Sequence, residues 1–300
     1  MTSPNPPSFL TALAQSTHLI LDGATGTELN RRGVDTGLPL WSAKALTNER
    51  DAAILQNIHE DYLRAGAHII STNTFRTNRR ALAPSGNADR ALELTRRAVD
   101  IARAAIANAP ADQPRFVAGS ISTLEDCYRP DLVPPDHELR TEHSERINHL
   151  VTCDVDLILI ETINTLREAL VIAELAANTG TPAIVSFVCD RDGKILSGET
   201  LTQAAAQLLP LGISAIGVNC GPTPYLAQPL AELHAACGRD FPLIAYGNIG
   251  YPDDTVGWIN TDSEDASFYC QQAALWPAKI IGGCCGTTPD HIRQLATSLR

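Results

Sequence analysis

Three cysteines are the residues in this chain best suited to chemistry. Cys284 and Cys285 are adjacent within a glycine-rich turn, and Cys220 lies upstream of them. Neighbouring cysteines form a strained ring if they pair with each other, whereas the flanking glycines let the backbone bend until both sulfurs face one ion. Together with Cys220 they supply three thiolates and leave one position vacant, which is the ligand count of a catalytic zinc site rather than a structural one.

Three sulfur ligands also favour one kind of reaction. Zinc removes the proton of a thiol that binds to it, yet three thiolates keep the centre electron-rich, so the bound sulfur stays nucleophilic at neutral pH. This suits alkyl transfer to sulfur, whereas hydrolases favour histidine-rich sites that acidify water. The alternative is that Cys220, Cys284 and Cys285 are small core residues or a redox pair, because free cysteine is often buried and inert.

Polar residues end several other apolar runs. Asp22 and Gly23 begin a turn that is either a tight strand-to-loop connection or a set of backbone N–H groups able to hold a carboxylate or phosphate. Glu161 ends the apolar run 157–160, where a carboxylate is costly without a partner, so it is either part of an internal salt bridge or a docking point for a substrate ammonium. Asn219 is either a satisfied hydrogen-bonding group or a residue that orients ligands.

Eight short apolar runs alternate with stretches of helical periodicity, which predicts parallel strands covered by helices. Their number, and the chain length of 300 residues, favour a closed (β/α)8 TIM barrel in one domain, residues 9–300, after a loose tail, residues 1–8. A doubly wound open sheet is the alternative, but the first run is not followed by the Gly-x-Gly-x-x-Gly fingerprint. The expected strands are residues 18–22, 68–72, 116–120, 156–161, 183–188, 215–219, 243–246 and 279–282.

A barrel of this kind would bring the candidate residues together, because the active sites of barrel enzymes lie at the C-terminal ends of the strands. The residues that fall at such ends are Asp22, Gly23, Thr74, Glu161, Asn219, Cys220, Cys284 and Cys285. Two long connections, residues 125–136 and 247–265, also follow strands and should overhang the same rim. Helices are expected over residues 89–107 and 289–299, the second with Thr288 as its N-cap.

The composition limits the class of protein. A formal charge of −11 argues against a nucleic-acid or anionic-membrane surface. Eight cysteines without a Cys-x-x-Cys pair are too sparse for a disulfide scaffold, and no signal peptide or membrane-spanning run is evident. We therefore expect a cytoplasmic protein with small-molecule partners, no nucleic-acid partner and no membrane partner; the sequence leaves a homo-oligomer open.

Taken together, these segments resemble the homocysteine S-methyltransferase family. The matching pieces run in family order over nearly the whole chain, at residues 22–27, 72–75, 161–162, 217–220 and 282–287. Cobalamin-dependent members carry additional modules for which this chain has no room. The closer comparison is therefore with the stand-alone, zinc-dependent members that use S-methylmethionine or betaine.

The resemblance implies a site as well as a fold. Zn²⁺ would be held by Cys220, Cys284 and Cys285, and homocysteine would supply the fourth ligand through its sulfur. The amino-acid end of homocysteine would lie near Asp22, Gly23 and Glu161. Thr74 and Asn219 are expected as further substrate-binding residues.

The sequence departs from the family around the expected donor. Sulfonium-using relatives read Tyr-Pro-Asn-x-Gly-Glu after the seventh strand, whereas residues 246–251 here carry Gly247 and Tyr251 in place of the Pro and the Glu. Residues 125–130 also differ from the best-known members. Tyr251, Trp41 or Trp258 is expected to face the cationic donor.

The expected function is zinc-dependent transfer of a methyl group from a small onium donor to the zinc-bound thiolate of homocysteine, giving methionine. S-methylmethionine is the first candidate for the donor. One alternative is a non-catalytic thiol- or zinc-binding barrel protein. The other is a thiol-activating component fed by a separate corrinoid protein.

Overall fold

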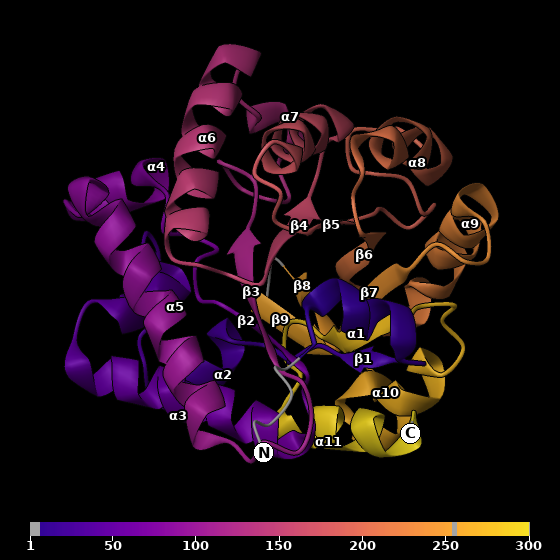
Figure 1. Ribbon diagram of the computed structural model, residues 1–300, viewed down its shortest axis with the longest axis horizontal. Coiled ribbons are helices and arrows are strands. Elements are labelled where there is room, and N and C mark those ends of the chain that lie inside the picture. The colour runs from indigo at the N-terminus through magenta and orange to yellow at the C-terminus, as the bar shows by residue number, and fades with distance from the viewer. Residues whose placement is uncertain (1–6, 254–256, 300) are drawn as a thin grey trace.

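In the computed structural model, which describes residues 7–253 and 257–299, eight parallel strands form a barrel surrounded by helices (Figure 1). Neighbouring strands follow the order β1-β10-β7-β6-β5-β4-β3-β2, and a bridge between Leu21 and Ile69 joins β1 to β2. The ring therefore closes, which confirms the predicted (β/α)8 barrel and excludes the open sheet. The strands are β1 (Leu19–Ile20), β2 (Ile69–Ser71), β3 (Phe116–Ile121), β4 (Leu157–Ile163), β5 (Ala183–Phe187), β6 (Ala215–Pro222), β7 (Leu243–Asn248) and β10 (Ile280–Gly283).

Polar side chains cap the N-termini of several helices between the strands, among them α3, α7, α8 and α11. Thr200 and Thr288 form capping boxes, and Thr288 precedes a proline in the first helical turn, as predicted. No helix within the described chain is both long and apolar enough to cross a membrane. The helices are α1 (Phe9–Gln15), α2 (Gly26–Arg31), α3 (Glu49–Ala65), α4 (Arg79–Leu82), α5 (Ala91–Asn108), α6 (Asp136–Thr152), α7 (Leu166–Ala177), α8 (Leu201–Leu208), α9 (Ala227–Cys237), α10 (Ala266–Ala273) and α11 (Pro289–Ser298).

Side chains alternate along each strand and so build two separate cores. Outward-facing residues such as Ile20, Ile158 and Ile216 pack beneath the helices. Inward-facing residues fill the barrel, and they are Leu19, Leu21, Ile69, Phe116, Ala118, Leu157, Leu159, Ile184, Ala215, Ile244, Tyr246 and Ile280. Close packing of both layers fixes where each strand ends, and hence where its last side chains lie.

Helix α1 belongs to the inner core and covers one end of the barrel. Phe9 packs edge-on against Phe116, with ring centroids 5.5 Å apart. Ser8 caps this helix by accepting a hydrogen bond from the Thr11 amide at 3.2 Å. Of the predicted tail, residues 1–6 lie outside the described chain, and the helix begins at Phe9.

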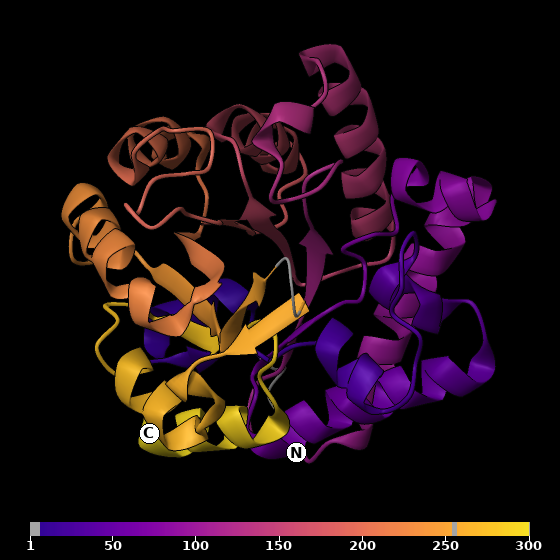
Figure 2. The ribbon, with the colours of Figure 1, turned by 180° about the vertical axis from the view of Figure 1, so that it is seen from behind.

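The predicted connection 247–265 contains an antiparallel hairpin that the sequence did not reveal. Strands β8 (Gly250–Asp253) and β9 (Gly257–Asn260) pair with each other and with no barrel strand. The segment is rich in Gly, Pro and Asp, which indicate turns rather than strands, and each strand is short. Figures 1 and 2 place this hairpin at the end of the barrel opposite α1.

One buried histidine makes the fold sensitive to acid. His59 on α3 is 0% exposed, and neither ring nitrogen has a hydrogen-bond partner within the described chain. Burial lowers the pKa of His59 from 6.5 to about 4, so the folded protein keeps this ring neutral while the unfolded chain protonates it. Stability therefore falls as the pH drops from the unfolded pKa towards the folded one.

We expect replacement of His59 by Leu to remove part of this acid sensitivity. Protonation of His59 in the unfolded chain lowers the free energy of unfolding of the wild type by about 2 kcal/mol between pH 7 and pH 5, and the variant should not show this decrease. Urea unfolding at both pH values measures it, with His137→Leu as control, because the His137 side chain is 81% exposed. Equal losses in wild type and His59→Leu would contradict the assignment.

Candidate active site

The three predicted cysteines meet at the C-terminal end of the barrel. The sulfurs of Cys220, Cys284 and Cys285 all lie within 4.8 Å of one another, and Cys220 Sγ is 3.9 Å from Cys285 Sγ. None is in a disulfide. Hydrogen bonds from Cys284 and Cys285 lower the pKa of the Cys220 thiol, while the same contact with Cys220 raises the pKa of Cys284. The contact among the three sulfurs therefore favours the thiolate of Cys220 and the protonated thiol of Cys284.

Irregular backbone at the ends of β4 and β6 aims the side chains that follow. The pairing of β6 with β7 shifts register between Asn219 and Pro222, and Cys220 within this shift has φ 59°. β4 does the same between Ile160 and Ile163, where Thr162 has φ 56°. Bulges re-aim side chains, and a left-handed non-glycine residue costs on the order of 1–3 kcal/mol, so both sites hold backbone strain next to the cavity.

One side-chain amide ties the two cysteine segments together. Asn248, at the end of β7, donates from Nδ2 to the Cys220 carbonyl at 2.8 Å, and its Oδ1 accepts from the Cys285 amide at 2.9 Å. On the far side of the turn, Arg31 of α2 donates to the carbonyls of Gly286 and Thr287. The spacing of the three sulfurs is thus set by backbone hydrogen bonds as well as by the barrel.

Two carboxylates lie deep in the same site. Asp22 is 1% exposed and accepts from the Ser71 amide at 2.9 Å and the Ser71 hydroxyl at 2.8 Å. Burial raises its pKa well above the usual range, although these hydrogen bonds oppose the shift. Glu161 accepts hydrogen bonds from the hydroxyls of Ser120 and Tyr246. Burial raises the pKa of Glu161 to about 7, and the nearby Cys220 adds to the rise.

The three cysteines and the two carboxylates line one cavity of about 560 Å³, a size that suits small-molecule ligands. Asp22, Gly23, Glu161 and the three cysteines form part of its wall. A side chain at Gly23 would not fit, because an added Cβ would lie 2.7 Å from the Tyr62 ring. Predicted residues from the ends of four strands, β1, β4, β6 and β10, therefore converge on this cavity, as expected at the rim of a barrel.

Two of the predicted substrate-binding residues lie behind the cavity wall and do not line it. Thr74 is 2% exposed and donates to the Ser120 carbonyl at 2.7 Å. Asn219 accepts from the Thr162 amide at 3.0 Å and from the Ser186 hydroxyl at 2.8 Å, so it points into the barrel like the other inward positions of β6. The turn at Cys220 separates the two neighbours, which the sequence pattern does not show.

Several cavity groups were not predicted. Ser71, Ser120 and Tyr246 line the cavity and hold the two carboxylates, and the Tyr128 hydroxyl lies 3.1 Å from Cys220 Sγ. The serines occupy inward positions one step beyond the apolar core, and this alternation is the signal that would have found them. Tyr128 and the neighbouring Cys127, another wall residue, lie on the irregular connection after β3, where no periodicity operates.

The three aromatic candidates for the donor differ in position. Trp41 lines the cavity and packs edge-on against Phe75, with centroids 5.6 Å apart. Tyr251 lies on β8, outside the lining of this cavity, and borders a smaller one. The Trp258 side chain lies outside the part of the chain that the structure describes.

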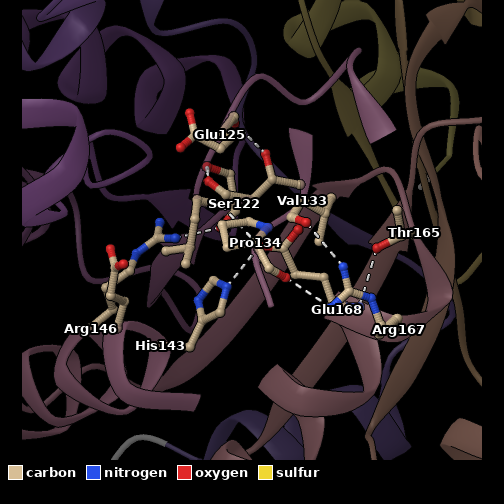
Figure 3. Close-up of polar contacts among 12 residues, drawn as sticks. Ser122, Glu125, Val133, Pro134, His143, Arg146, Thr165, Arg167 and Glu168 are labelled. Atoms are coloured by element: carbon tan, nitrogen blue, oxygen red, sulfur yellow. Dashed lines mark hydrogen bonds and ion pairs between the residues drawn. The ribbon is translucent and has the colours of Figure 1, made fainter. Parts of the chain in front are cut away.

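A buried polar cluster holds the connection that carries Cys127 and Tyr128 (Figure 3). Glu168 Oε1 accepts from the Leu124 amide at 2.9 Å and contacts His143 Nε2 at 2.8 Å. Arg146 donates to the carbonyls of Ser122 and Phe75. Arg167 donates to the carbonyls of Pro134 and Val133 at 2.8 Å and 3.1 Å. Both ends of this connection are therefore fixed to α6 and α7.

Comparisons with known proteins agree with this geometry. The family model described as homocysteine S-methyltransferase matches residues 19–299. Homocysteine S-methyltransferase YbgG of Bacillus subtilis is 31% identical over 94% of this chain and 94% of its own, and homocysteine S-methyltransferase 4 of Zea mays is 29% identical over 94% and 89%. The metallated form of the homocysteine methyltransferase MmuM from Escherichia coli superposes with a TM-score of 0.82 at 29% identity, covering 96% of this chain and 98% of that one.

We expect the Asn248 amide to be needed for tight metal retention at the three sulfurs. Asn248→Ala leaves every sulfur in place but frees two backbone segments, so the affinity for zinc should fall by about 10- to 100-fold. Competition with a chromophoric chelator measures this affinity. Asn178→Ala is the control, because Asn178 bonds a helix carbonyl at the surface; unchanged affinity in Asn248→Ala would show that the barrel alone fixes the spacing.

Proposed function

Because this chain belongs to the homocysteine S-methyltransferase family, we propose that it takes a methyl group from a small onium donor, with S-methylmethionine as the first candidate. It is a methyltransferase whose acceptor is homocysteine and whose product is methionine. The observation that carries the metal assignment, and with it the binding of a thiol acceptor, is the cluster of three free thiols whose sulfurs lie within 4.8 Å of one another in the cavity wall.

The three sulfur ligands fit zinc, and we assign Cys220, Cys284 and Cys285 as the residues that bind it. Three sulfurs are soft ligands, their spacing brings all three within reach of one ion, and the related MmuM structure is described as metallated. When bound there, zinc would act as a Lewis acid that ionises a thiol at neutral pH. The negative charge of three thiolates, costly at this separation, is what such a cation would offset.

The chemical step is a displacement at carbon. The homocysteine sulfur forms a bond to the methyl carbon while the bond from that carbon to the donor sulfur breaks, and the electron pair of the broken bond stays on the donor sulfur. The thiol proton has already left to solvent, so the step needs no general base. The sulfonium becomes a neutral thioether, and with S-methylmethionine both products are methionine.

The protein contributes orientation and exclusion of water. We assign Asp22 and Glu161 to the ammonium of homocysteine, with Gly23 next to Asp22 in the same wall of the cavity. Trp41, in the cavity wall, is placed to face the donor cation. Thr74 and Asn219 act through their neighbours: Thr74 supports Ser120, which holds Glu161, and Asn219 fixes the bulge at Thr162.

The donor assignment is tested by supplying the zinc-loaded protein with homocysteine and, separately, S-methylmethionine, betaine or a methylated corrinoid protein. Methionine formed with S-methylmethionine alone supports the proposal, and activity only with the corrinoid protein points to a thiol-activating component. Cys220→Ser, Cys284→Ser and Cys285→Ser should each lower bound zinc and abolish transfer, whereas Cys237→Ser, on α9, should do neither. Zinc bound without turnover on any donor would indicate a non-catalytic barrel.

Glu161 gives the reaction a predictable pH dependence. The Glu161 pKa is raised by burial to about 7, so its carboxylate, the form that attracts an ammonium, is lost as the pH falls below that value. We expect kcat/KM for homocysteine to fall about tenfold per pH unit below this pKa. In Glu161→Gln this slope should vanish and kcat/KM at pH 8 should drop by about 10- to 100-fold. A variant that keeps the wild-type profile would remove Glu161 from acceptor binding.

A further inference from the structure

One cationic side chain in the cavity wall has no counterpart of opposite charge. Arg76, on the connection after β2, is partly buried and donates from Nε to the Pro39 carbonyl at 3.2 Å. Its terminal nitrogens have no hydrogen-bond partner within residues 7–253 and 257–299, and no described carboxylate lies within 4.0 Å of it. A guanidinium presents paired donors that match a carboxylate, so these free donors call for an anionic ligand.

The other arginine in the described wall is already neutralised. Arg80 pairs with Glu125 at 2.8 Å, with Glu138 at 2.5 Å and also with Glu142. These hydrogen bonds raise the pKa of Arg80 beyond its ordinary range, as expected for a cation surrounded by carboxylates. Arg76 is therefore the cation that remains available to a ligand entering from the rim.

Arg76 and the two carboxylates lie on different elements of the cavity wall. Arg76 follows β2 and donates to the Pro39 carbonyl at 3.2 Å. Asp22 and Glu161 lie at the ends of β1 and β4, where hydroxyl groups of Ser71, Ser120 and Tyr246 donate to them. The carboxylates thus suit the ammonium of the acceptor, whereas Arg76 offers the opposite charge on another segment of the wall.

The backbone that carries Arg76 is held in place. Arg146, buried beneath it, donates to the carbonyl of Phe75 at 3.2 Å and also to that of Ser122 (Figure 3). One side chain thereby links the segment before Arg76 to the connection on the other side of the cavity. Because the backbone next to Arg76 is fixed in this way, less conformational freedom is lost when its guanidinium binds a ligand.

We propose that Arg76 binds the carboxylate of the methyl donor, so that this protein selects onium donors that carry a carboxylate. The inference rests on the proposed methyl transfer and narrows it to donors such as S-methylmethionine, whose carboxylate is separated from the sulfonium by a short chain. Donors without that group, or a corrinoid protein, would supply no carboxylate for the Arg76 guanidinium to bind. The cation of the donor then faces Trp41 and Phe75, which line the same part of the wall.

The test compares two sulfoniums that differ only in the carboxylate: S-methylmethionine and dimethyl(3-aminopropyl)sulfonium. Binding of each to the zinc-loaded protein is measured by calorimetry, alongside KM, for wild type, Arg76→Ala and Arg76→Lys. We expect Arg76→Ala to lower the affinity for S-methylmethionine by about 10- to 100-fold and Arg76→Lys to lower it less. The decarboxylated compound should bind all three proteins alike.

Arg97→Ala is the matched control, because Arg97 is also partly buried and donates to a backbone carbonyl, that of Asn48, but does not line the cavity. It should leave both affinities unchanged. Equal weakening of both sulfoniums by Arg76→Ala would make Arg76 a structural support and overturn the proposal. So would weakening of homocysteine instead, which would place its carboxylate there.

A second measurement distinguishes failure of the proposed methyl transfer from failure of the Arg76 assignment. In cobalt(II)-substituted protein the three cysteines already give thiolate-to-metal absorption, and a fourth sulfur ligand from homocysteine would add to it, whether or not any donor reacts. An increase on adding homocysteine without binding of S-methylmethionine would overturn the Arg76 assignment while the acceptor site stands. Binding of S-methylmethionine that depends on Arg76, but no such increase, would uphold the carboxylate site and reject the proposed chemistry.

Discussion

The constraint on which the site depends is the close spacing of three sulfur atoms, which all lie within 4.8 Å of one another. Thiolates at this separation cannot all be ionised unless a cation joins them, and the opposite pKa shifts of Cys220 and Cys284 express that conflict. The fold holds this spacing through the hydrogen bonds of the Asn248 side-chain amide, the strained turn at Cys220 and the Arg31 contacts to the turn after Cys285. Removing the conflict by binding a metal is therefore favourable both for the ion and for the fold.

The barrel makes this possible by separating its apolar interior from its polar floor. Inward positions on each strand are apolar up to the middle of the barrel and polar one step further, where Ser71, Ser120 and Glu161 lie. A carboxylate at that level is costly, but the Glu161 carboxylate accepts hydrogen bonds from hydroxyl groups on β3 and β7. The electrostatic strength of the site thus comes from the same close packing that stabilises the sheet.

Sequence patterns captured what periodicity and residue type can encode. All eight barrel strands were predicted, because apolar runs bounded by turns carry a local signal. Asp22, Glu161 and the three cysteines were predicted at strand ends because such groups are unusual beside apolar runs, and in the structure they line one cavity. The patterns could not show that the turn at Cys220 leaves Asn219 facing inward, nor that Thr74 lies behind the wall. Tyr128 and Arg76 lie on irregular connections, whose course is set by tertiary contacts such as those of Arg146 and Glu168.

Helix α1 has a consequence for traffic through the molecule. With Phe9 packed against Phe116, α1 covers the end of the barrel opposite the rim where the strand ends form the cavity wall. Under the assignments proposed above, entry and exit would both take place at that rim. Homocysteine at Asp22 and Glu161 would then enter before the methyl donor, and its methylated product would leave after the demethylated donor.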